Sequence, residues 1–196
     1  GWEVKYLKDI SKITMGQSPK SEFYNRSGLG LPFHQGVSNF GDRYPKTIHY
    51  CTIEKRIANK GDVLFSVRAP VGRINIANSK MVIGRGLCAI SHNSGCQWFL
   101  LHMLKEIFMD EDIIGGGTIF KSVTKNDMET IKVINPCDKI RKAYNDLVNP
   151  IEVMLENLYN RNAVLRQTRD LLLPKLISGE MDVSELDIKV PEEVAI

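Results

Sequence analysis

Residues 151–173, with the sequence IEVMLENLYNRNAVLRQTRDLLL, decide the architecture that we expect for this chain of 196 residues. Apolar side chains recur there at alternating steps of three and four, which is typical of a helix that packs along another helix. The seam consists of Ile151, Leu155, Leu158, Asn162, Leu165 and Leu172. Asn162 is its polar member and would set the register at some loss of stability. At about 1.5 Å per residue the stretch spans roughly 35 Å, too long for one side of a small core. We therefore expect a rod that holds two bodies apart.

The same spacing extends to both sides of this stretch. Asp138, just after Pro136, is of a residue type that caps helix N-termini. Pro150 falls inside the pattern without changing its register, which favours a kinked helix over a split one. Ser178 and Gly179 are expected to stop the helix. These signals predict a globular domain over residues 1–135, a long helix over residues 136–180 and a tail over residues 181–196.

The first 135 residues have the pattern of a β-rich domain. Short apolar runs separated by Gly, Pro and Asn turns predict strands over residues 48–53, 63–67, 74–77, 81–83 and 131–134. Residues 97–108 have helical spacing, residues 124–129 suit a short helix, and residues 2–15 form a short entry element. Residues 34–41 are rich in amides, hydroxyls and glycine, which predicts a loop that offers little to a core. With the long helix, these elements define an α+β fold.

Composition and charge narrow the class of protein. Hydrophobic residues make up 43% and charged residues 25%, which is ordinary for a globular chain in water. No run approaches the roughly 18 apolar residues of a membrane span and no signal peptide opens the chain, so a cytoplasmic location without membrane contact is expected. The net charge is only +3, with cations concentrated in loops, which suits nucleic-acid contact better than adsorption to a membrane.

The cysteines favour neither disulfides nor a metal site. Cys51, Cys88, Cys96 and Cys137 contain no CxxC pair, so buried thiols are expected. The set Cys88, His92, Cys96 and His102 has zinc-capable side chains, but structural zinc sites usually bring their ligands in tight pairs. Core or surface roles are therefore expected for these residues, and no metal.

Catalytic motifs are lacking. Residues 115–122, GGGTIFKS, approach the phosphate-binding pattern G-x-x-x-x-G-K-[ST], but Phe120 stands where that loop needs a glycine close to phosphate. No nucleophile elbow and no HExxH motif occur in the sequence. We therefore expect a chain without catalytic activity of its own and without a cofactor.

The polar loops offer groups that read DNA. The candidates are Ser18, Lys20, Gln35, Ser38, Asn39, Arg43, Arg68, Arg73, Arg85, Lys121 and Ser122. Gln and Asn pair bidentately with adenine, Arg pairs with guanine, and Lys or Ser contacts phosphates. The alternative is that these loops are merely solvated surface, because polar loops are common.

Several motifs carry a resemblance to a known family. They are GQSP at residues 16–19, LPFHQG at 31–36, GDVLFSVRAPVG at 61–72, IGRGL at 83–87, GTIFKS at 117–122 and LRQTRDLLLPKLISGE at 165–180. In this order they cover nearly the whole chain, which thereby resembles the specificity subunits of type I restriction–modification systems.

The resemblance implies a target-recognition domain that reads half of a bipartite site in double-stranded DNA, followed by a long helix. Full-length members have two such units, whose helices pack antiparallel as a spacer. They direct adenine methylation and cleavage by the methyltransferase (modification) and restriction subunits, without catalysis of their own. The end of the helix, with Arg166, Arg169 and Lys175, is expected to dock the methyltransferase.

This sequence holds only one recognition domain and one helix. The resemblance therefore implies that a second copy, or the second half of a longer chain, completes the pattern. One rival interpretation is a helix-mediated assembly module whose globular domain binds protein, and loop chemistry distinguishes the two. Another is that the helix folds back on its own domain.

Overall fold

The computed structural model describes residues 1–108 and 122–184. Contacts divide the chain into two compact units, Gly1–Asn149 and Pro150–Ile196. The described residues of the first unit form three β-sheets and three short helices, and a long helix that begins in the first unit continues into the second. The expected α+β class is confirmed.

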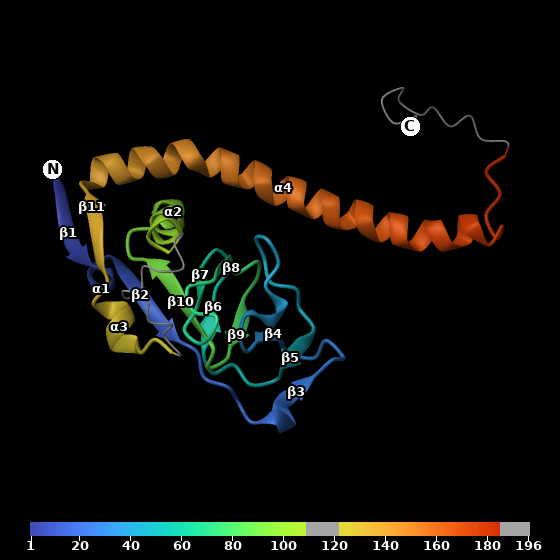
Figure 1. Cartoon of the computed structure of the whole chain (residues 1–196), viewed down its shortest axis with the longest axis horizontal. Coiled ribbons are helices and arrows are strands. Elements are labelled where there is room, and N and C mark those ends of the chain that lie inside the picture. The colour runs from blue at the N-terminus through green and yellow to red at the C-terminus, as the bar shows by residue number, and fades with distance from the viewer. Residues whose placement is uncertain (109–121, 185–196) are drawn as a thin grey trace. The chain divides into compact units, whose positions relative to one another are not determined.

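A four-stranded antiparallel sheet forms the centre of the first unit, in the order β2-β10-β7-β8 (Figure 1). Its strands are β2 (Ser11–Met15), β10 (Leu87–His92), β7 (Val63–Ser66) and β8 (Ile74–Ile76). All four residues of β7 are buried, as expected for a continuous apolar run that pairs on both edges. The predicted strands at 63–67 and 74–77 are confirmed.

A second, five-stranded sheet has the order β3-β5-β4-β9-β6. Its strands are β3 (Tyr24–Asn25), β5 (His49–Cys51), β4 (Leu31–His34), β9 (Met81–Ile83) and β6 (Ile57–Ala58). The pairing of β4 with β9 is parallel, whereas the other pairs are antiparallel. Side chains from both sheets share one core cluster, which includes Leu64, Met81, Ile83 and Leu87.

The segment 34–41 corrects one expectation. His34 is buried at the end of β4, and the 3₁₀ turn η2 (Val37–Asn39) follows it. Val37 and Phe40 pack against the core cluster. The segment after His34 is a loop with one 3₁₀ turn, as predicted, but the expectation that it offers little to a core was wrong, because its apolar side chains anchor it.

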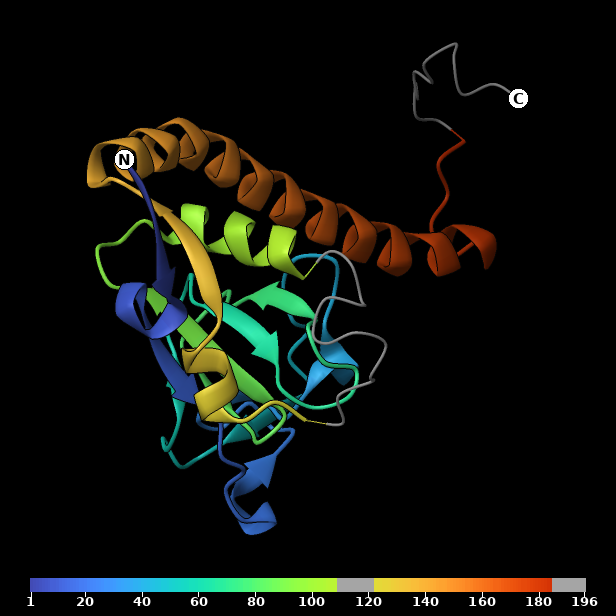
Figure 2. The same cartoon turned by 60° about the vertical axis from the view of Figure 1, so that its left-hand side comes forward.

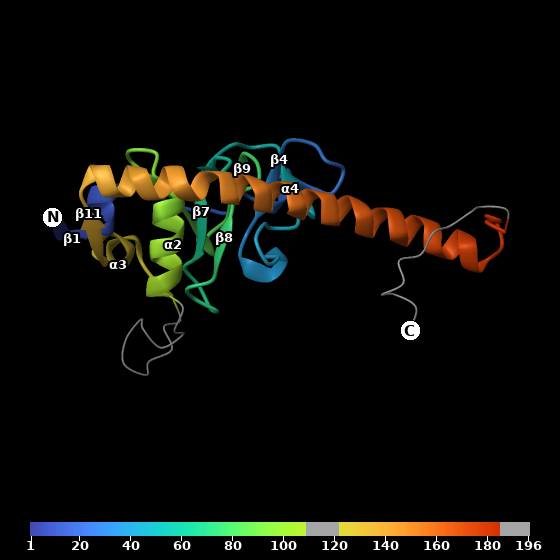
Figure 3. The ribbon, with the colours of Figure 1, turned by 90° about the horizontal axis from the view of Figure 1, so that it is seen from above.

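A two-stranded ribbon forms one end of the first unit (Figure 3). It pairs β1 (Trp2–Tyr6) antiparallel with β11 (Lys132–Pro136), beside α1 (Leu7–Ile10) and α3 (Lys125–Glu129). Thr124 caps α3 in a capping box with Asp127. Residues 2–15, expected as one entry element, thus divide into β1, α1 and β2, because the two strands pair with different partners, β11 and β10.

Helix α2 (Gln97–Ile107) confirms the helix predicted over residues 97–108, and it lies against the first turns of α4 (Figure 2). Trp98 donates from its backbone N–H to Asn145 Oδ1 at 3.1 Å and from its indole to Asn149 Oδ1 at 3.0 Å. Tyr144 meets Phe99 edge to face, and its hydroxyl lies 2.8 Å from His102 Nδ1. The start of α4 is thereby fixed to the globular unit.

Helix α4 runs from Asp138 to Ile177 with Pro150 and Pro174 inside it, so it is not split at Pro150. The prediction of Asp138 as the N-cap was off by one residue. The carbonyl of Cys137 accepts from Ile140 and Arg141, while the Asp138 carboxylate accepts from Arg141. Gly179, with a φ of 72°, ends the helix where Ser178 and Gly179 predicted it.

Beyond Pro150, α4 buries none of its apolar side chains. From Pro150 to Ser184, all of them described, every apolar residue is exposed or partly exposed. The exposed seam positions are Ile151, Leu155, Leu158, Leu165 and Leu172, and the exposed fraction reaches 65% at Leu165. Within the described ranges, no helix has the length and apolarity to cross a membrane.

Candidate nucleic-acid interface

Three motif segments meet where strands β2, β4, β9 and β10 begin or end. Four backbone hydrogen bonds of 2.8–3.0 Å hold them: Gly16 N–H to Leu87 O, Gln17 N–H to Ile83 O, Gly84 N–H to His34 O and Gly86 N–H to Gln35 O. We call residues 16–18, 34–36 and 83–87 the glycine junction. It joins the two larger sheets of the unit through main-chain contacts.

The junction requires glycine at three positions. A Cβ atom on Gly16 would lie 2.1 Å from the carbonyl oxygen of Gly84, and one on Gly84 would lie 2.7 Å from Gln35 Cα. A Cβ atom on Gly86 would lie 2.5 Å from Gln35 O. These neighbours are backbone atoms, which cannot rotate away, so glycine allows the close approach of the segments.

The junction presents Ser18, Gln35 and Arg85 on a rigid support. The backbone N–H of Arg85 donates to Ser18 Oγ at 3.2 Å, which ties the first segment to the third. Gln35 and Arg85 are exposed, whereas Gly84 and Gly86 are buried. A fixed backbone under exposed polar side chains suits base reading, because little loop entropy remains to be lost on binding.

Arg68, in the β7–β8 loop, and Ser122, which pairs with it, lie beside the junction. The backbone N–H of Val67 donates to Gly86 O at 3.0 Å, and Val123 N–H donates to Val67 O at 2.8 Å. Arg68 and Ser122 pair as an antiparallel bridge, and both are exposed. Lys121, the neighbouring candidate, lies outside the described residues.

Buried Ser66 fixes the shape of this loop. Its hydroxyl donates to Pro70 O at 2.7 Å and accepts from the backbone N–H of Arg73 at 2.8 Å. Gly72, with a φ of 89°, makes the return turn. The exposed candidates Arg68 and Arg73 therefore project from the same ordered turn.

The other candidates have different surroundings. The Arg43 guanidinium lies over the rings of Tyr44 and Trp98, 5.3 and 5.9 Å from their centroids, and so belongs with α2. Ser38 and Asn39 lie on η2, and Lys20 precedes the 3₁₀ turn η1 (Ser21–Phe23). Lys20 is exposed, with Glu22 4.0 Å away. Among the described residues, the structure brings Ser18, Gln35, Arg68, Arg85 and Ser122 together at the junction, with Arg73 on the same turn as Arg68.

Tyr24 belongs beside the junction, although it is not among the predicted site residues. Its ring stacks on Phe33 with centroids 4.5 Å apart, and its hydroxyl donates to Pro19 O at 2.6 Å. Burial raises the pKa of Tyr24 and nearby Cys51 adds to this, while Ser18 and Arg85 oppose it. No local pattern reveals the contact, because it depends on the pairing of β3 and β4 with β5.

His34 adds no positive charge near neutral pH. Burial, and secondarily the proximity of His49, lowers its pKa to about 4, and its Nε2 lies 3.5 Å from Thr47 Oγ1. The positive charge displayed around the junction therefore comes from Arg68 and Arg85, both in exposed positions.

The residues considered for zinc form no metal site. Burial raises the pKa of Cys88 to about 12, which disfavours a thiolate ligand, and His92 Nδ1 accepts from the backbone N–H of Ser94 at 3.1 Å. Within residues 1–108 and 122–184, no three His, Cys, Asp or Glu side chains gather as metal ligands. Cys51, Cys88 and Cys96 are buried thiols as expected, but Cys137 is exposed.

Comparison with known proteins bears on this surface. A family model for the type I restriction modification DNA specificity domain matches residues 1–160. A protein named as the MjaX specificity subunit of a type I restriction enzyme, from Methanocaldococcus jannaschii, is 36% identical over 93% of this chain and 44% of its own length. The HindI specificity subunit of Haemophilus influenzae is 28% identical over 92% of this chain and 42% of its own.

Solved structures agree in fold. The HsdS subunit of Thermoanaerobacter tengcongensis has a TM-score of 0.66 and 32% identity, covering 92% of this chain and 46% of that one. The S subunit of a type I restriction–modification system from M. genitalium shares the fold alone, with a TM-score of 0.68 and 16% identity over 91% and 46% of the two chains. This chain spans less than half the length of each of these relatives.

Proposed function

We propose that this chain, which belongs to the family of type I restriction modification DNA specificity domains, recognises a specific sequence in double-stranded DNA. The observation that carries the proposal is the glycine junction, which holds Ser18, Gln35 and Arg85 on a fixed backbone beside Arg68 and Ser122. These side chains combine donors for guanine, paired groups for adenine and hydroxyls for phosphates.

The candidates divide into two roles. Arg68, Arg85 and Gln35 read base edges, because guanidinium and amide groups match them bidentately. Ser18, Ser122 and Lys121 contact phosphates close to the reading groups. The other candidates, Lys20, Ser38, Asn39, Arg43 and Arg73, contribute to the surrounding phosphate contacts.

The chain supplies one half of a bipartite reader. The exposed seam of α4 pairs antiparallel with a second α4, from a second copy or the second half of a longer chain, and sets the distance between two recognition units. Methyltransferase subunits dock near residues 165–180 and methylate adenine, and a restriction subunit joins for cleavage. In this arrangement the chain has no catalytic role, and the proposed setting is the cytoplasm, where the DNA and these subunits meet.

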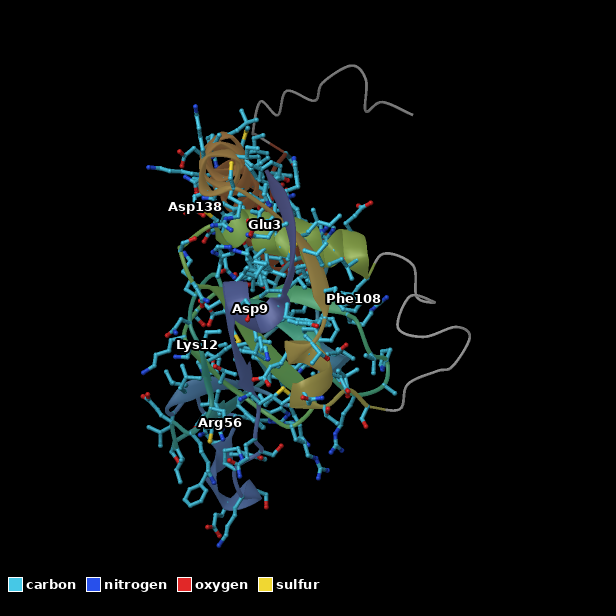
Figure 4. The ribbon with its side chains drawn as sticks, turned by 90° about the vertical axis from the view of Figure 1, so that its left-hand side faces the viewer. Glu3, Asp9, Lys12, Arg56, Phe108 and Asp138 are labelled. Carbon is cyan, nitrogen blue, oxygen red and sulfur yellow. The ribbon has the colours of Figure 1, made fainter. Side chains whose placement is uncertain are left out.

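The test is selection from random duplexes by the purified chain with its methyltransferase subunits. The chain is expected to enrich one sequence, and Arg85→Ala is expected to weaken binding to it by about tenfold to a hundredfold with relaxed preference at one position. Lys142→Ala is the matched control, because it removes the same charge far from the junction. Lys142 lies one helical turn after Asp138, and Asp138 lies at the opposite end of the unit from Arg56 (Figure 4). Arg56 marks the junction, since its carbonyl accepts from the backbone N–H of Ile83. This control is expected to leave the preference unchanged.

Two outcomes would reject the proposal. One is the absence of any enriched sequence, and the other is equal loss from Arg85→Ala and Lys142→Ala. Leu158→Asp distinguishes the protein-assembly alternative. If the chain is only an assembly module, this variant loses its partner, and the chain shows no DNA sequence preference with or without the substitution. If the chain reads DNA, the variant loses its partner but its globular unit still binds DNA.

A further inference from the structure

An exposed leucine is held at the tip of the turn between β3 and β4, residues 25–30, which we call the leucine turn. Leu29 is 64% exposed, and Gly28 and Gly30 on either side of it have φ values of 84° and 89°. Asn25 closes the turn, since its Nδ2 donates to Leu29 O at 2.8 Å and its Oδ1 accepts from the backbone N–H of Leu29 at 3.0 Å. Ser27 Oγ donates to the same Oδ1 at 3.1 Å. The turn therefore presents an apolar side chain from a fixed backbone.

The leucine turn is anchored on its inner side. A Cβ atom on Gly30 would lie 2.2 Å from Cys51 O, so the turn lies directly against the main chain at the end of β5. The residues before the turn are held too, because the backbone N–H of Thr52 donates to Phe23 O at 3.2 Å. Single exposed apolar side chains are common on protein surfaces. Leu29 differs from them because hydrogen bonds and close backbone contacts fix its position without covering its side chain.

Cations lie around this leucine. Arg26 is exposed within the leucine turn, and the β5–β6 connection beside it carries the exposed Lys55 and Arg56. Two carboxylates nearby each have a lysine partner, in the pairs Glu22–Lys20 and Glu54–Lys80. Proteins that enter the minor groove of DNA combine the same two features, because cations meet its negative potential while an apolar side chain meets the bases. The chemistry of the turn therefore suits a minor groove.

The leucine turn lies within reach of the glycine junction, on the side of Ser18. Tyr24 directly precedes the turn, and its hydroxyl donates to the carbonyl of Pro19, the neighbour of Ser18. From Leu29 to Gln35 the chain runs through β4, and its six steps of about 3.3 Å set an upper limit of roughly 20 Å. On one side of a duplex, the major and minor grooves alternate every half turn, or about 17 Å along the axis. A unit that places Gln35 in the major groove therefore brings Leu29 to the adjacent minor groove.

We infer that the leucine turn enters the minor groove beside the half-site, with Leu29 against the groove floor and Arg26 at the flanking phosphates. The inference rests on the DNA recognition of the proposed function and adds a contact outside the glycine junction. It requires A·T pairs at the contacted position, because the 2-amino group of guanine projects from the floor of the minor groove and would meet the leucine. The half-site is therefore expected to be flanked by A·T pairs, about five base pairs from those read at the junction.

Asn25 is a positioning residue in this arrangement, because it fixes the main chain of Leu29 and not its side chain. Asn25→Ala is expected to weaken binding to the selected duplex about fivefold, but less than about twofold further in a chain that already carries Leu29→Ala. The same loss in both backgrounds would contradict this role, since Asn25 would then act independently of the leucine.

Equilibrium binding to the selected duplex tests the contact, with the chain bound to its methyltransferase subunits. Leu29→Ala is expected to weaken binding about tenfold, because it removes the apolar contact with the groove floor. The matched control is Ile134→Ala, 61% exposed on β11, in the ribbon that lies away from β3 in Figures 1 and 2. This control is expected to change binding by less than about twofold. Thermal unfolding should be unchanged in both variants, since both side chains are exposed.

Base analogues identify the groove. Replacing the flanking A·T pairs by G·C is expected to weaken binding of the unsubstituted chain about tenfold. Inosine·C pairs present the minor groove of A·T and the major groove of G·C, so they are expected to restore binding. The Leu29→Ala chain should bind all three duplexes within about twofold of one another. Equal losses with inosine·C and G·C would place the contact in the major groove and overturn the inference, as would a flank without preference.

Failure of this inference is distinguishable from failure of the proposed function. If Leu29→Ala binds the selected duplex as tightly as the unsubstituted chain while Arg85→Ala weakens binding, the inference is overturned and the proposed function stands. If no duplex is enriched, both are overturned. If Leu29→Ala weakens the binding of the methyltransferase subunits in the absence of DNA, the leucine turn contacts protein, and the inference is likewise overturned.

Discussion

The globular unit and the later part of α4 treat their apolar residues in opposite ways. In β7, Val63, Leu64 and Phe65 are wholly buried, whereas on α4 Leu158 is 49% and Leu165 is 65% exposed. Both regions are rich in leucine, isoleucine and valine, so composition does not cause the difference. The globular unit closes a core from its own sheets, while the helix beyond Pro150 leaves its seam exposed, as proposed for a helix that pairs with a partner. Under the proposed function, one chain thus combines a globular recognition unit with a helix that associates.

The largest expected effect separates the two regions directly. Phe65→Ala is expected to lower the free energy of unfolding of the globular unit by about 4 kcal/mol, because it empties a buried site. Leu158→Ala is expected to change that free energy by less than about 0.5 kcal/mol, because its side chain lies outside this core. Urea unfolding at low protein concentration measures both, and comparable losses would show that the seam supports the globular fold.

Association should respond in the reverse order. Leu158→Asp is expected to raise the dimer dissociation constant about a hundredfold, or roughly 2.7 kcal/mol, because a charge enters the seam. Asn160→Asp, exposed off the seam, serves as the matched control and should change it little. Sedimentation over a range of concentrations gives both constants, and an unaffected Leu158→Asp dimer would mean that the helix pairs through another face.

The close approach of segments at the glycine junction is expected to stabilise the globular unit by itself. Gly84→Ala is expected to destabilise it by about 2 kcal/mol, because the new Cβ meets the backbone of Gln35. Gly36→Ala is the control within the same junction, since its φ is −168° and no heavy atom lies within 4 Å of an added Cβ. Thermal unfolding compares the two, and equal stability would show that the close approach is unimportant.

Acid should weaken only the globular unit. Burial holds the folded pKa of His34 at about 4, below its ordinary 6.5, so the folded state binds fewer protons than the unfolded state. Neutral His34 therefore contributes its full stabilisation above pH about 6.5, and this stabilisation is lost as pH falls toward 4. At pH 5.5 the loss in the free energy of unfolding is about 1.4 kcal/mol. His34→Gln should reduce the pH dependence of urea unfolding in this range, and an unchanged dependence would contradict it. The seam contains no histidine, so dimerisation should not share this loss.

The sequence predicts those parts of the fold that local pattern controls. The buried run Val63–Val67, the spacing of residues 97–108 and the Ser178-Gly179 stop each correspond to an element or boundary of the structure. The loop motifs indicated which segments carry polar groups. Which of these groups converge was beyond the sequence, because Gly16, Gly84 and Gln35 meet through contacts between distant segments.

The misses have the same origin. The sequence predicts Arg43 as a cation in a DNA-binding loop. In the structure its guanidinium lies over the ring of Trp98, more than fifty residues later in the chain. The ribbon of β1 and β11 joins residues at opposite ends of the globular unit's sequence, and local pattern does not predict which distant strand pairs with β1. Long-range pairing, and not local propensity, decides these features.

Selection from random duplexes tests the central claim most directly, because two copies of this recognition unit that pair through antiparallel helices, as proposed, read a symmetric site. With the chain and its methyltransferase subunits, the recovered sequences are expected to contain one half-site and its inverted repeat, separated by a fixed spacer, and Leu158→Asp should abolish the fixed spacing. An enriched single half-site without a partner, or no enrichment, would contradict the account.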